Sequence, residues 1–266
     1  MTAINRYRNV FISDIHLGAK DAKVAFLLKL LPSIRADRIY LIGDIFDIWA
    51  MKRRVFWPTG HQRVFSALLQ LSRQCQQLVF IPGNHDEALK AMHQMGWENV
   101  EILPQASLDL LDGRRALLVH GDQFDSEVCL GHWYSLVGDY AYSALLACNR
   151  GLHRVRKWLR LPYWSLSTHL KTKVKGAQSA IERFEQAASR AAIQSEHDMV
   201  ICGHNHQPAL NVGDVTYLNT GDWVGNCTFA AETLRGDLVL LRWSDSMNCP
   251  EEIAVQSSTL VQKAVA

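Results

Sequence analysis

Five short polar clusters in the chain carry residue types that bind metal ions or transfer protons. Each follows an apolar run, and most lie beside a glycine that permits a tight turn. The clusters are Asp14 with His16, Asp44 with Asp47, Asn84-His85-Asp86, His120 with Asp122, and His204 with His206. Imidazole, carboxylate and amide oxygen together suit ions such as Mn, Fe, Zn, Co or Ni, whereas a structural zinc site usually has thiolates. The residue types therefore indicate a metal centre that performs chemistry.

The spacing within the clusters favours two ions in one site. Side chains two residues apart in an extended segment point the same way, so Asp14-x-His16 and His204-x-His206 can each face one centre. A single aspartate after a strand is usually a helix cap, but five clusters in this position argue against that structural interpretation. Two divalent ions about 3.5 to 4 Å apart can share a carboxylate and a hydroxide, and clamp a phosphoryl oxygen for in-line attack. The chemistry indicated is hydrolysis of a phosphoester or phosphoanhydride bond.

The elements that must position these clusters alternate between strand and helix in the first half of the chain. Apolar runs at 10 to 14, 38 to 44 and 78 to 84 predict buried strands, followed by helices at 22 to 35, at about 61 to 74 and after Asp86. Further strand patterns at 115 to 122, 198 to 206, 214 to 223 and 237 to 243 have little helix between the last ones. We expect an α/β fold with two packed sheets and the clusters beyond the carboxyl ends of strands.

The chain divides into a core and an insertion. Residues 123–195 lack strand patterns, so we expect a helical insertion between the core segments 1–122 and 196–245, with residues 246–266 as a peripheral tail. Between Asp139 and Glu182 there are eight basic residues and no acidic ones, which leaves 20 basic against 26 acidic residues elsewhere. The insertion therefore concentrates the positive charge of the chain.

Composition argues against a membrane-spanning or disulfide-rich protein. No window approaches 18 consecutive apolar residues, and the first residues lack the apolar stretch of a signal peptide. The six cysteines are scattered without a CxxC pair. We therefore expect a soluble, cytoplasmic protein.

In order along the chain, the motifs DIH, GDIFD, GNHD, HGD and GHNH resemble the signature of the calcineurin-like metallophosphoesterases. The resemblance implies a metallophosphoesterase four-layer αββα sandwich in which the insertion forms a helical cap. It also implies two divalent metal ions, with Mn²⁺ as the expected ion. By this similarity Asp14, His16 and His206 hold the first ion, Asn84, His120 and His204 hold the second, and Asp44 bridges the two.

The same resemblance assigns catalysis to the GNHD motif. His85 is expected to be the general acid, with Asp86 holding its other ring nitrogen, and Asn84 and His85 are expected to contact the substrate. Asp47 and Asp122 are expected to orient ligands rather than to bind metal.

Within the family, the spacing of the motifs, the insertion after HGD and the GHNHQP ending are similar to those of UDP-2,3-diacylglucosamine hydrolases. Those enzymes split a pyrophosphate in lipid A synthesis, which implies a lipid-linked nucleotide diphosphate as substrate. A basic cap would also permit peripheral contact with the anionic inner face of the cytoplasmic membrane. The lysines Lys171, Lys173 and Lys175 are candidates to contact the diphosphate.

One position departs from that pattern. The lipid A enzymes have GNRD where this chain has His85, and arginine cannot donate a proton at neutral pH whereas histidine can. The difference favours a paralogue, or a general phosphodiesterase or phosphatase that acts on nucleotides.

Other interpretations stay open. The basic charge of the insertion can be a solvated helix face, and basic residues interleaved with aromatic ones also suit nucleic acid. A binding protein that keeps the fold without turnover is a further alternative, although all seven expected ligands and His85 are present. The sequence indicates no protein partner.

Overall fold

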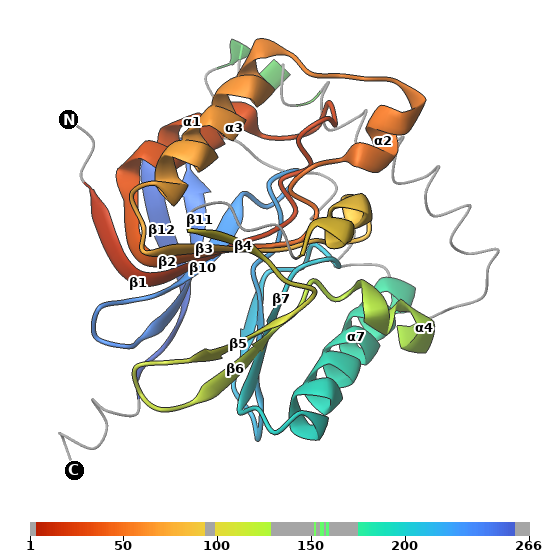
Figure 1. Ribbon diagram of the computed structural model, residues 1–266, viewed down its shortest axis with the longest axis vertical. Coiled ribbons are helices and arrows are strands. Elements are labelled where there is room, and N and C mark those ends of the chain that lie inside the picture. Colours follow the sequence, from red (N-terminus) through yellow and green to blue (C-terminus); the bar gives the residue numbers. More distant parts are fainter. Residues whose placement is uncertain are drawn as a thin grey trace.

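The computed structural model describes residues 4–93, 99–128 and 175–258, together with Leu152, Val155, Arg156, Trp158 and Leu159. These residues build two β-sheets that face each other, with helices on the outer faces (Figure 1). Among the described residues, no helix combines the length and the apolar character needed to cross a membrane.

The first sheet has seven strands in the order β12-β11-β10-β1-β2-β3-β4. Its strands are β1 (Asn5–Ile12), β2 (Ile34–Ile42), β3 (Gln77–Ile81), β4 (Val100–Ile102), β10 (Thr228–Glu232), β11 (Leu238–Ser244) and β12 (Cys249–Gln256). Strands β1 to β4 are parallel, and β10 to β12 are added antiparallel on the other side of β1. The carboxyl ends of β1, β2 and β3 therefore meet at one edge.

The second sheet has five strands in the order β5-β6-β7-β9-β8. Its strands are β5 (Ala106–Asp109), β6 (Arg115–Leu118), β7 (Met199–Cys202), β8 (Ala209–Asn211) and β9 (Thr216–Asn219). The three central strands β6, β7 and β9 are parallel, and β5 and β8 are antiparallel edge strands.

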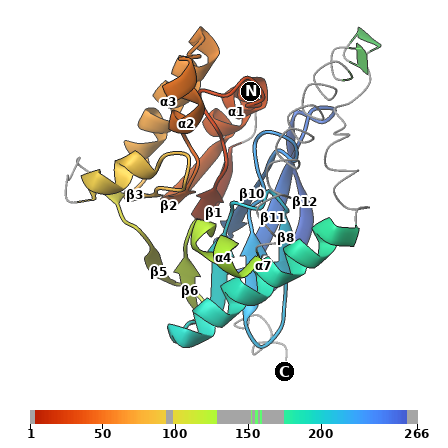
Figure 2. The ribbon, with the colours of Figure 1, turned by 90° about the vertical axis from the view of Figure 1, so that its right-hand side faces the viewer.

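Helices cover both outer faces of the sandwich. The α-helices that are described over their whole length are α1 (Val24–Leu30), α2 (Ile48–Arg53), α3 (Thr59–Ser72), α4 (Asp125–Val128) and α7 (Lys175–Gln194). Short 3₁₀ helices are η1 (Leu31–Ser33), η2 (Glu87–Met92) and η3 (Asp122–Phe124). Figure 2 shows α1 and α3 outside the first sheet and α7 along the second.

The alternating direction of side chains along the strands explains the four layers. In β1, Val10 and Ile12 pack toward α1 and α3, whereas Phe11 packs toward the second sheet. In β7, Met199 faces the first sheet and Val200 faces α7. Both central sheets are thus apolar on two faces, as the continuous apolar runs in the sequence predicted. The predicted αββα sandwich is confirmed.

Two element predictions differ from the structure at their boundaries. The predicted helix at 22 to 35 is α1 followed by η1, and β2 already begins at Ile34 because its first residues pair with the start of β1. The helix predicted after Asp86 is the 3₁₀ helix η2.

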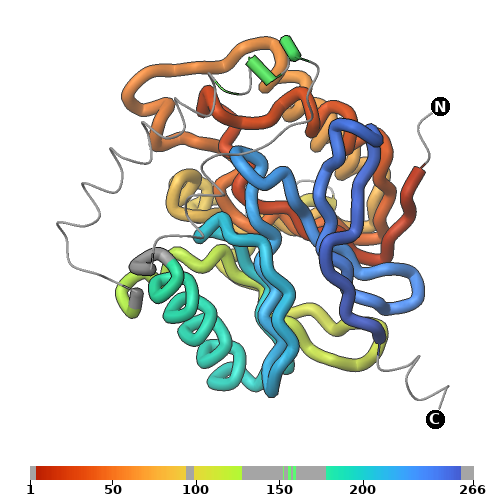
Figure 3. The backbone as a smooth tube through the Cα atoms, turned by 180° about the vertical axis from the view of Figure 1, so that it is seen from behind, coloured from red at the N-terminus to blue at the C-terminus, as the bar shows by residue number. Residues whose placement is uncertain are grey.

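The peripheral tail predicted for residues 246–266 is wrong for its described part. Cys249–Gln256 forms β12, which pairs antiparallel with β11 at the edge of the first sheet (Figure 3). The strand is half-buried, so its residues do not form the continuous apolar run of a central strand.

The predicted insertion 123–195 also ends too late. The helix α7 packs on the outer face of the second sheet, where Phe184, Ala188 and Ala192 join Leu117 and Val200 in one apolar cluster. Because α7 supplies the fourth layer, it belongs to the core rather than to a cap. The remainder of the predicted insertion, apart from residues 123–128 and the five positions named above, lies outside the described residues.

Candidate metal centre

The predicted ligands lie just beyond the carboxyl ends of five parallel strands, three from the first sheet and two from the second. Asp14 and His16 follow β1, Asp44 follows β2, Asn84 follows β3, His120 follows β6, and His204 and His206 follow β7. The backbone continues the β1–β2 pairing past the strands, because Asp14 N donates to Gly43 O (3.0 Å) and His16 N donates to Asp44 O (2.8 Å). Sheet pairing therefore brings together turns that are far apart in sequence.

The first group of potential ligands is Asp14, His16 and His206. His206 Nε2 lies 3.1 Å from Asp14 Oδ1 and 3.3 Å from His16 Nε2. The Asp14 carboxylate is buried, and within the described part of the chain Oδ1 has no hydrogen-bond partner of good geometry besides the nearby imidazole nitrogen. Burying a carboxylate oxygen without a good hydrogen bond costs free energy of folding, unless a bound cation interacts with it.

The second group is Asp44, His120 and His204, with Asn84 beside it. His120 Nε2 lies 3.2 Å from Asn84 Oδ1, 3.3 Å from His204 Nδ1 and 3.4 Å from Asp44 Oδ2. Asp44 Oδ2 also lies 3.9 Å from His16 Nε2, which belongs to the first group. Asp44 is thus positioned between the two groups, as a bridging carboxylate must be.

The separations fit shared coordination. Donors that each bind one ion at about 2.0 to 2.2 Å lie roughly 3 to 3.4 Å from one another. Both groups contain nitrogen and oxygen atoms at such distances, and the donors are the borderline types that first-row divalent ions prefer. The residues present therefore fit two divalent ions.

Most of the ligand residues have a strained backbone. Eight non-glycine residues in the described part of the chain have positive φ, and five of them are predicted ligands. They are Asp14 (φ 50°), His16 (54°), Asp44 (53°), His204 (68°) and His206 (58°). The left-handed region is unfavourable for side chains with a Cβ, and such strain concentrates at functional sites. The turns are therefore shaped for the site rather than for local stability.

Glycines leave room for the ligand side chains. A Cβ on Gly83 would meet Asp44 Oδ1 and lie 2.6 Å from His120 Nε2, and a Cβ on Gly203 would meet Asp14 Oδ2. Because these neighbours belong to expected ligand side chains, both glycines are required for close approach rather than for a special φ.

The charges in the site perturb one another strongly. Burial would lower the pKa of His16, but its hydrogen bond to Asp47 and the charges of Asp44 and Asp14 outweigh burial and raise the pKa to about 9. In the same way Asp44 outweighs burial and raises the pKa of His120 to about 10. Burial would raise the pKa of Asp44, but His120 and His16 hold it well below its usual range. The carboxylates thus favour cationic partners.

The prediction that Asp86 holds the ring of His85 is wrong. The buried Asp86 carboxylate accepts backbone N–H groups of Gly83 (2.7 Å) and Ile45 (2.8 Å), and no hydrogen bond among the described residues joins it to the His85 ring. Its carboxylate ties the turn after β3 to the turn after β2. Burial, followed by the charge of Asp44, raises the pKa of Asp86.

The partner of His85 is Asp47 instead. His85 Nδ1 lies 2.9 Å from Asp47 Oδ1, and the other oxygen of Asp47 lies 3.5 Å from His16 Nδ1. Asp47 Oδ1 also accepts the N–H of Ala50 and so caps α2. His85 Nε2 is left facing the site, 4.0 Å from Asp44 Oδ2. One carboxylate therefore orients both an expected metal ligand and the expected general acid.

Asp122 does not orient a ligand. Its carboxylate lies 3.5 Å from Lys90 Nζ, whereas Asp125, three residues later, lies 2.8 Å from His204 Nε2. Asp222 lies 3.7 Å from His206 Nδ1. Sequence reasoning missed both residues, because Asp125, three residues after HGD, and Asp222, in the TGDW segment, have no pattern that distinguishes them from other turn aspartates.

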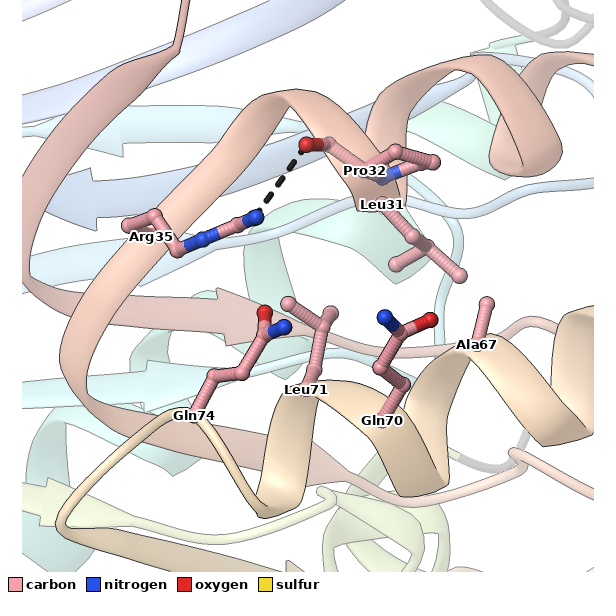
Figure 4. Close-up of a pocket in the computed structure, with 7 residues that line it drawn as sticks. All are labelled: Leu31, Pro32, Arg35, Ala67, Gln70, Leu71 and Gln74. Carbon is pink, nitrogen blue, oxygen red and sulfur yellow. Dashed lines mark hydrogen bonds between the residues drawn. The ribbon is translucent and has the colours of Figure 1, made fainter.

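The candidate substrate lysines are not placed. Lys171 and Lys173 lie outside the described residues, and the side chain of Lys175 is not described. A hollow between η1 and α3, lined by Leu31, Pro32, Arg35, Ala67, Gln70, Leu71 and Gln74, is a different feature (Figure 4). It lies where β2 and β3 begin, at the edge of the sheet opposite the ligands.

The comparison with protein families identifies the class. A family model described as calcineurin-like phosphoesterase matches residues 7–208, which include all the predicted ligands. The chain therefore belongs to the calcineurin-like phosphoesterase family and is a metal-dependent phosphoester hydrolase.

Relatives within the family carry a narrower name. UDP-2,3-diacylglucosamine hydrolase of Serratia proteamaculans is 27% identical over 216 residues, covering 76% of this chain and 83% of that protein. The protein of the same name from Blochmanniella pennsylvanica is 25% identical over 214 residues, covering 76% and 80%. Among solved structures, a Vps29 single mutant from Entamoeba histolytica aligns with a TM-score of 0.47 at 12% identity, covering 93% of this chain and 97% of that one.

Proposed function

We propose that the chain binds two divalent ions, Mn²⁺ by expectation, and hydrolyses the pyrophosphate of a lipid-linked nucleotide diphosphate of the UDP-2,3-diacylglucosamine type. Asp14, His16 and His206 hold one ion, Asn84, His120 and His204 hold the other, and Asp44 is shared. The observation that carries the proposal is the convergence of these side chains in two donor groups with Asp44 between them. When bound, such ions acidify a water molecule and neutralise charge on the phosphoryl oxygens.

The protein residues supply orientation and a proton. With Nδ1 held by Asp47, His85 presents Nε2 toward the site, where it can protonate the departing oxygen. The His85 side chain is 23% exposed, so it can contact a bound substrate. The ring of Trp49 lies edge-on to the His85 ring at 5.3 Å and is 58% exposed, which makes it a wall that a substrate beside His85 would contact.

The substrate class rests on the named relatives, which cover most of this chain at 25–27% identity. The proposed cap, with its basic residues, would hold the lipid part and bring the protein to the anionic inner face of the cytoplasmic membrane as a peripheral, otherwise cytoplasmic protein.

A second candidate function is a general phosphodiesterase or phosphatase that acts on nucleotides or nucleic acid. It is favoured by His85, which stands where arginine is expected in the lipid A enzymes. Histidine can donate a proton to many leaving groups, so it does not require a substrate-specific charge contact.

Substrate comparison separates the two candidates. The metal-loaded protein is incubated with UDP-2,3-diacylglucosamine, and release of UMP is followed beside hydrolysis of simple nucleotide diphosphates. Efficient UMP release supports the lipid substrate. Good turnover of nucleotide diphosphates without UMP release from the lipid moves the assignment to the second candidate.

A further inference from the structure

The two histidines of the HNH segment use opposite ring nitrogens toward the site. His206 directs Nε2 at Asp14 and His16, whereas His204 directs Nδ1 at His120, 3.3 Å away. The outer nitrogen of His204 is therefore Nε2, and it meets Asp125 Oδ1 at 2.8 Å. A neutral imidazole has one N–H and one lone pair. A carboxylate can accept the N–H and cannot donate, so it selects the tautomer that leaves the Nδ1 lone pair facing the site.

The position of Asp125 is fixed by its neighbours, although its side chain is 60% exposed. The preceding residue, Phe124, is buried and packs edge-on against Phe184 of α7, with ring centroids 5.7 Å apart. Two residues later, Glu127 pairs with Arg190 of α7. The start of α4 is thus held on α7 from both sides of Asp125.

The His204 ring is also held from other directions. Phe184 stacks on it with centroids 5.9 Å apart, and the His204 backbone N–H donates to Asp14 Oδ2 at 3.0 Å. These contacts fix the plane and position of the ring but do not choose between its two tautomers. Asp125 is the contact that makes this choice.

We infer that Asp125 is a positioning residue for the metal centre, which holds His204 in the tautomer whose Nδ1 can bind the second ion. The inference rests on the proposed ligand role of His204 and on no particular substrate. Partners on the outer nitrogen of a ligating histidine raise its basicity and restrict its orientation, and their loss typically costs about 10- to 100-fold in metal affinity.

The test compares metal binding by the full chain and its variants in competition with a chromophoric chelator, using Mn²⁺ alone. Asp125→Ala removes the acceptor, and Asp125→Asn replaces it with an amide that can either accept from Nε2–H or donate to Nε2, and so no longer selects one tautomer. Asp125→Glu restores a carboxylate. The matched control is Glu127→Gln, which breaks the α4–α7 ion pair but keeps the Asp125 carboxylate and the packing of Phe124 on Phe184 that also anchors it.

A second readout needs no metal. In metal-free protein labelled with ¹⁵N-histidine, long-range proton–nitrogen spectra distinguish the two tautomers, and the His204 signal is assigned by its absence in His204→Asn. We expect the Nε2–H form in the wild type at alkaline pH and a shift toward Nδ1–H in Asp125→Asn.

We expect the wild type and Glu127→Gln to bind two ions with the same affinities. Asp125→Ala and Asp125→Asn should bind one of the two ions about 10- to 100-fold more weakly. Asp125→Glu should recover part of this affinity. Wild-type affinity for both ions in Asp125→Asn, with an unchanged His204 spectrum, would overturn the inference. An equal loss in Glu127→Gln would also overturn it, because the placement of α4 rather than the carboxylate would then matter. A wild type that binds fewer than two ions would instead overturn the ligand assignment itself.

Discussion

At the scale of single residues, Asp47 contacts both an expected metal ligand, His16, and the expected general acid, His85. Its carboxylate contacts Nδ1 of His85 at 2.9 Å and Nδ1 of His16 at 3.5 Å. Burial would raise the pKa of Asp47, but its hydrogen bonds to His16 and His85 hold it far below its usual range. The group therefore stays ionised and keeps both rings in place.

The first prediction concerns His85 and its partner. His85→Ala should keep both ions and lower kcat by roughly 10² to 10⁴, the usual loss for a general acid. Asp47→Asn should lower kcat as well and should weaken metal binding, because Asp47 also contacts His16. With metal at saturation, the double variant should lose little more kcat than His85→Ala, because Asp47 acts on the proton transfer through His85. Steady-state kinetics with metal analysis of each variant checks this. A His85→Ala protein that has lost a metal ion would show that His85 is a ligand instead.

The second prediction concerns protons. In metal-free protein the pKa is raised to about 9 for His16 and to about 10 for His120, so both rings are positively charged imidazolium groups at pH 7. The extra proton of each ring must leave before the ring can bind metal, so binding at pH 7 should release protons and apparent affinity should rise with pH until it passes about 10.

Calorimetric titration with Mn²⁺ at pH 7, in two buffers of different protonation enthalpy, measures this release. The observed heats should differ by the buffer enthalpy multiplied by the number of protons released. Identical heats in both buffers would contradict the expected charge state of the metal-free site.

At the scale of elements, the turns after the strands position the expected ligands, and the glycines of these turns leave the space that the ligand side chains occupy. A Cβ on Gly203 would meet Asp14 Oδ2 and Ser13 Oγ, whereas a Cβ on Gly213 would have its nearest neighbour 3.6 Å away at Val215 O. The two positions lie on either side of β8 and offer a matched pair of substitutions.

The third prediction follows from this pair. Gly203→Ala should displace Asp14 and weaken binding of the first ion by at least 10-fold, since Asp14 also accepts the His204 N–H. Gly213→Ala should bind both ions as the wild type does. Metal titration of both variants, with thermal melts to compare their folding, is the measurement; unaltered binding by Gly203→Ala would show that the turn has room that the structure does not indicate.

The hydrophobic pattern of the strands explains why the sequence could predict the central strands and the expected ligands. Strands buried on both faces read as continuous apolar runs, and the abrupt change to Asp, His or Asn at their ends marked every expected ligand. The same reasoning failed for β12, since a half-buried edge strand with Pro250, Glu251 and Glu252 has no such run. For α7 the sequence predicted a helix correctly but assigned it to the cap, because its buried stripe is largely alanine and lies next to a basic stretch.

Partner residues were harder to predict than ligands. Asp86 is adjacent to His85 in sequence, but its carboxylate turns back to backbone N–H groups, while Asp47 approaches from the turn of a neighbouring strand. Asp125 and Asp222 gave no specific signal, because aspartate is common in turns for local reasons. Adjacency along the chain does not indicate which side chains meet in a site built from several turns.

At the scale of the whole molecule, the site exists because two sheets pack face to face. Side chains from β1, β2 and β3 fill the interface opposite β6, β7 and β9, with Phe11 and Tyr40 stacked at 5.4 Å. This packing brings His120, His204 and His206 from the second sheet to Asp14 and Asp44 of the first. Neither sheet alone carries the complete set of expected ligands.

The fourth prediction concerns the proposed cap. Replacement of residues 130–174 by a short Gly/Ser linker should leave the sandwich and metal binding intact, because α4 and α7 contact each other and α7 packs on the second sheet. Hydrolysis of small aryl phosphates should persist, while hydrolysis of UDP-2,3-diacylglucosamine should be lost. Equal loss of both activities in a folded variant would mean that the segment supports the core rather than the substrate.

The most direct test of the central claim is hydrolysis of bis-(p-nitrophenyl) phosphate by the chain loaded with Mn²⁺, compared with Asp44→Asn in the same assay. Asp44 lies between both ligand groups, so its loss should lower metal content and abolish turnover. The account predicts clear metal-dependent release of p-nitrophenol by the wild type and none above background by Asp44→Asn. A folded wild type that is inactive with every divalent ion, or an Asp44→Asn protein that keeps full activity, would contradict it.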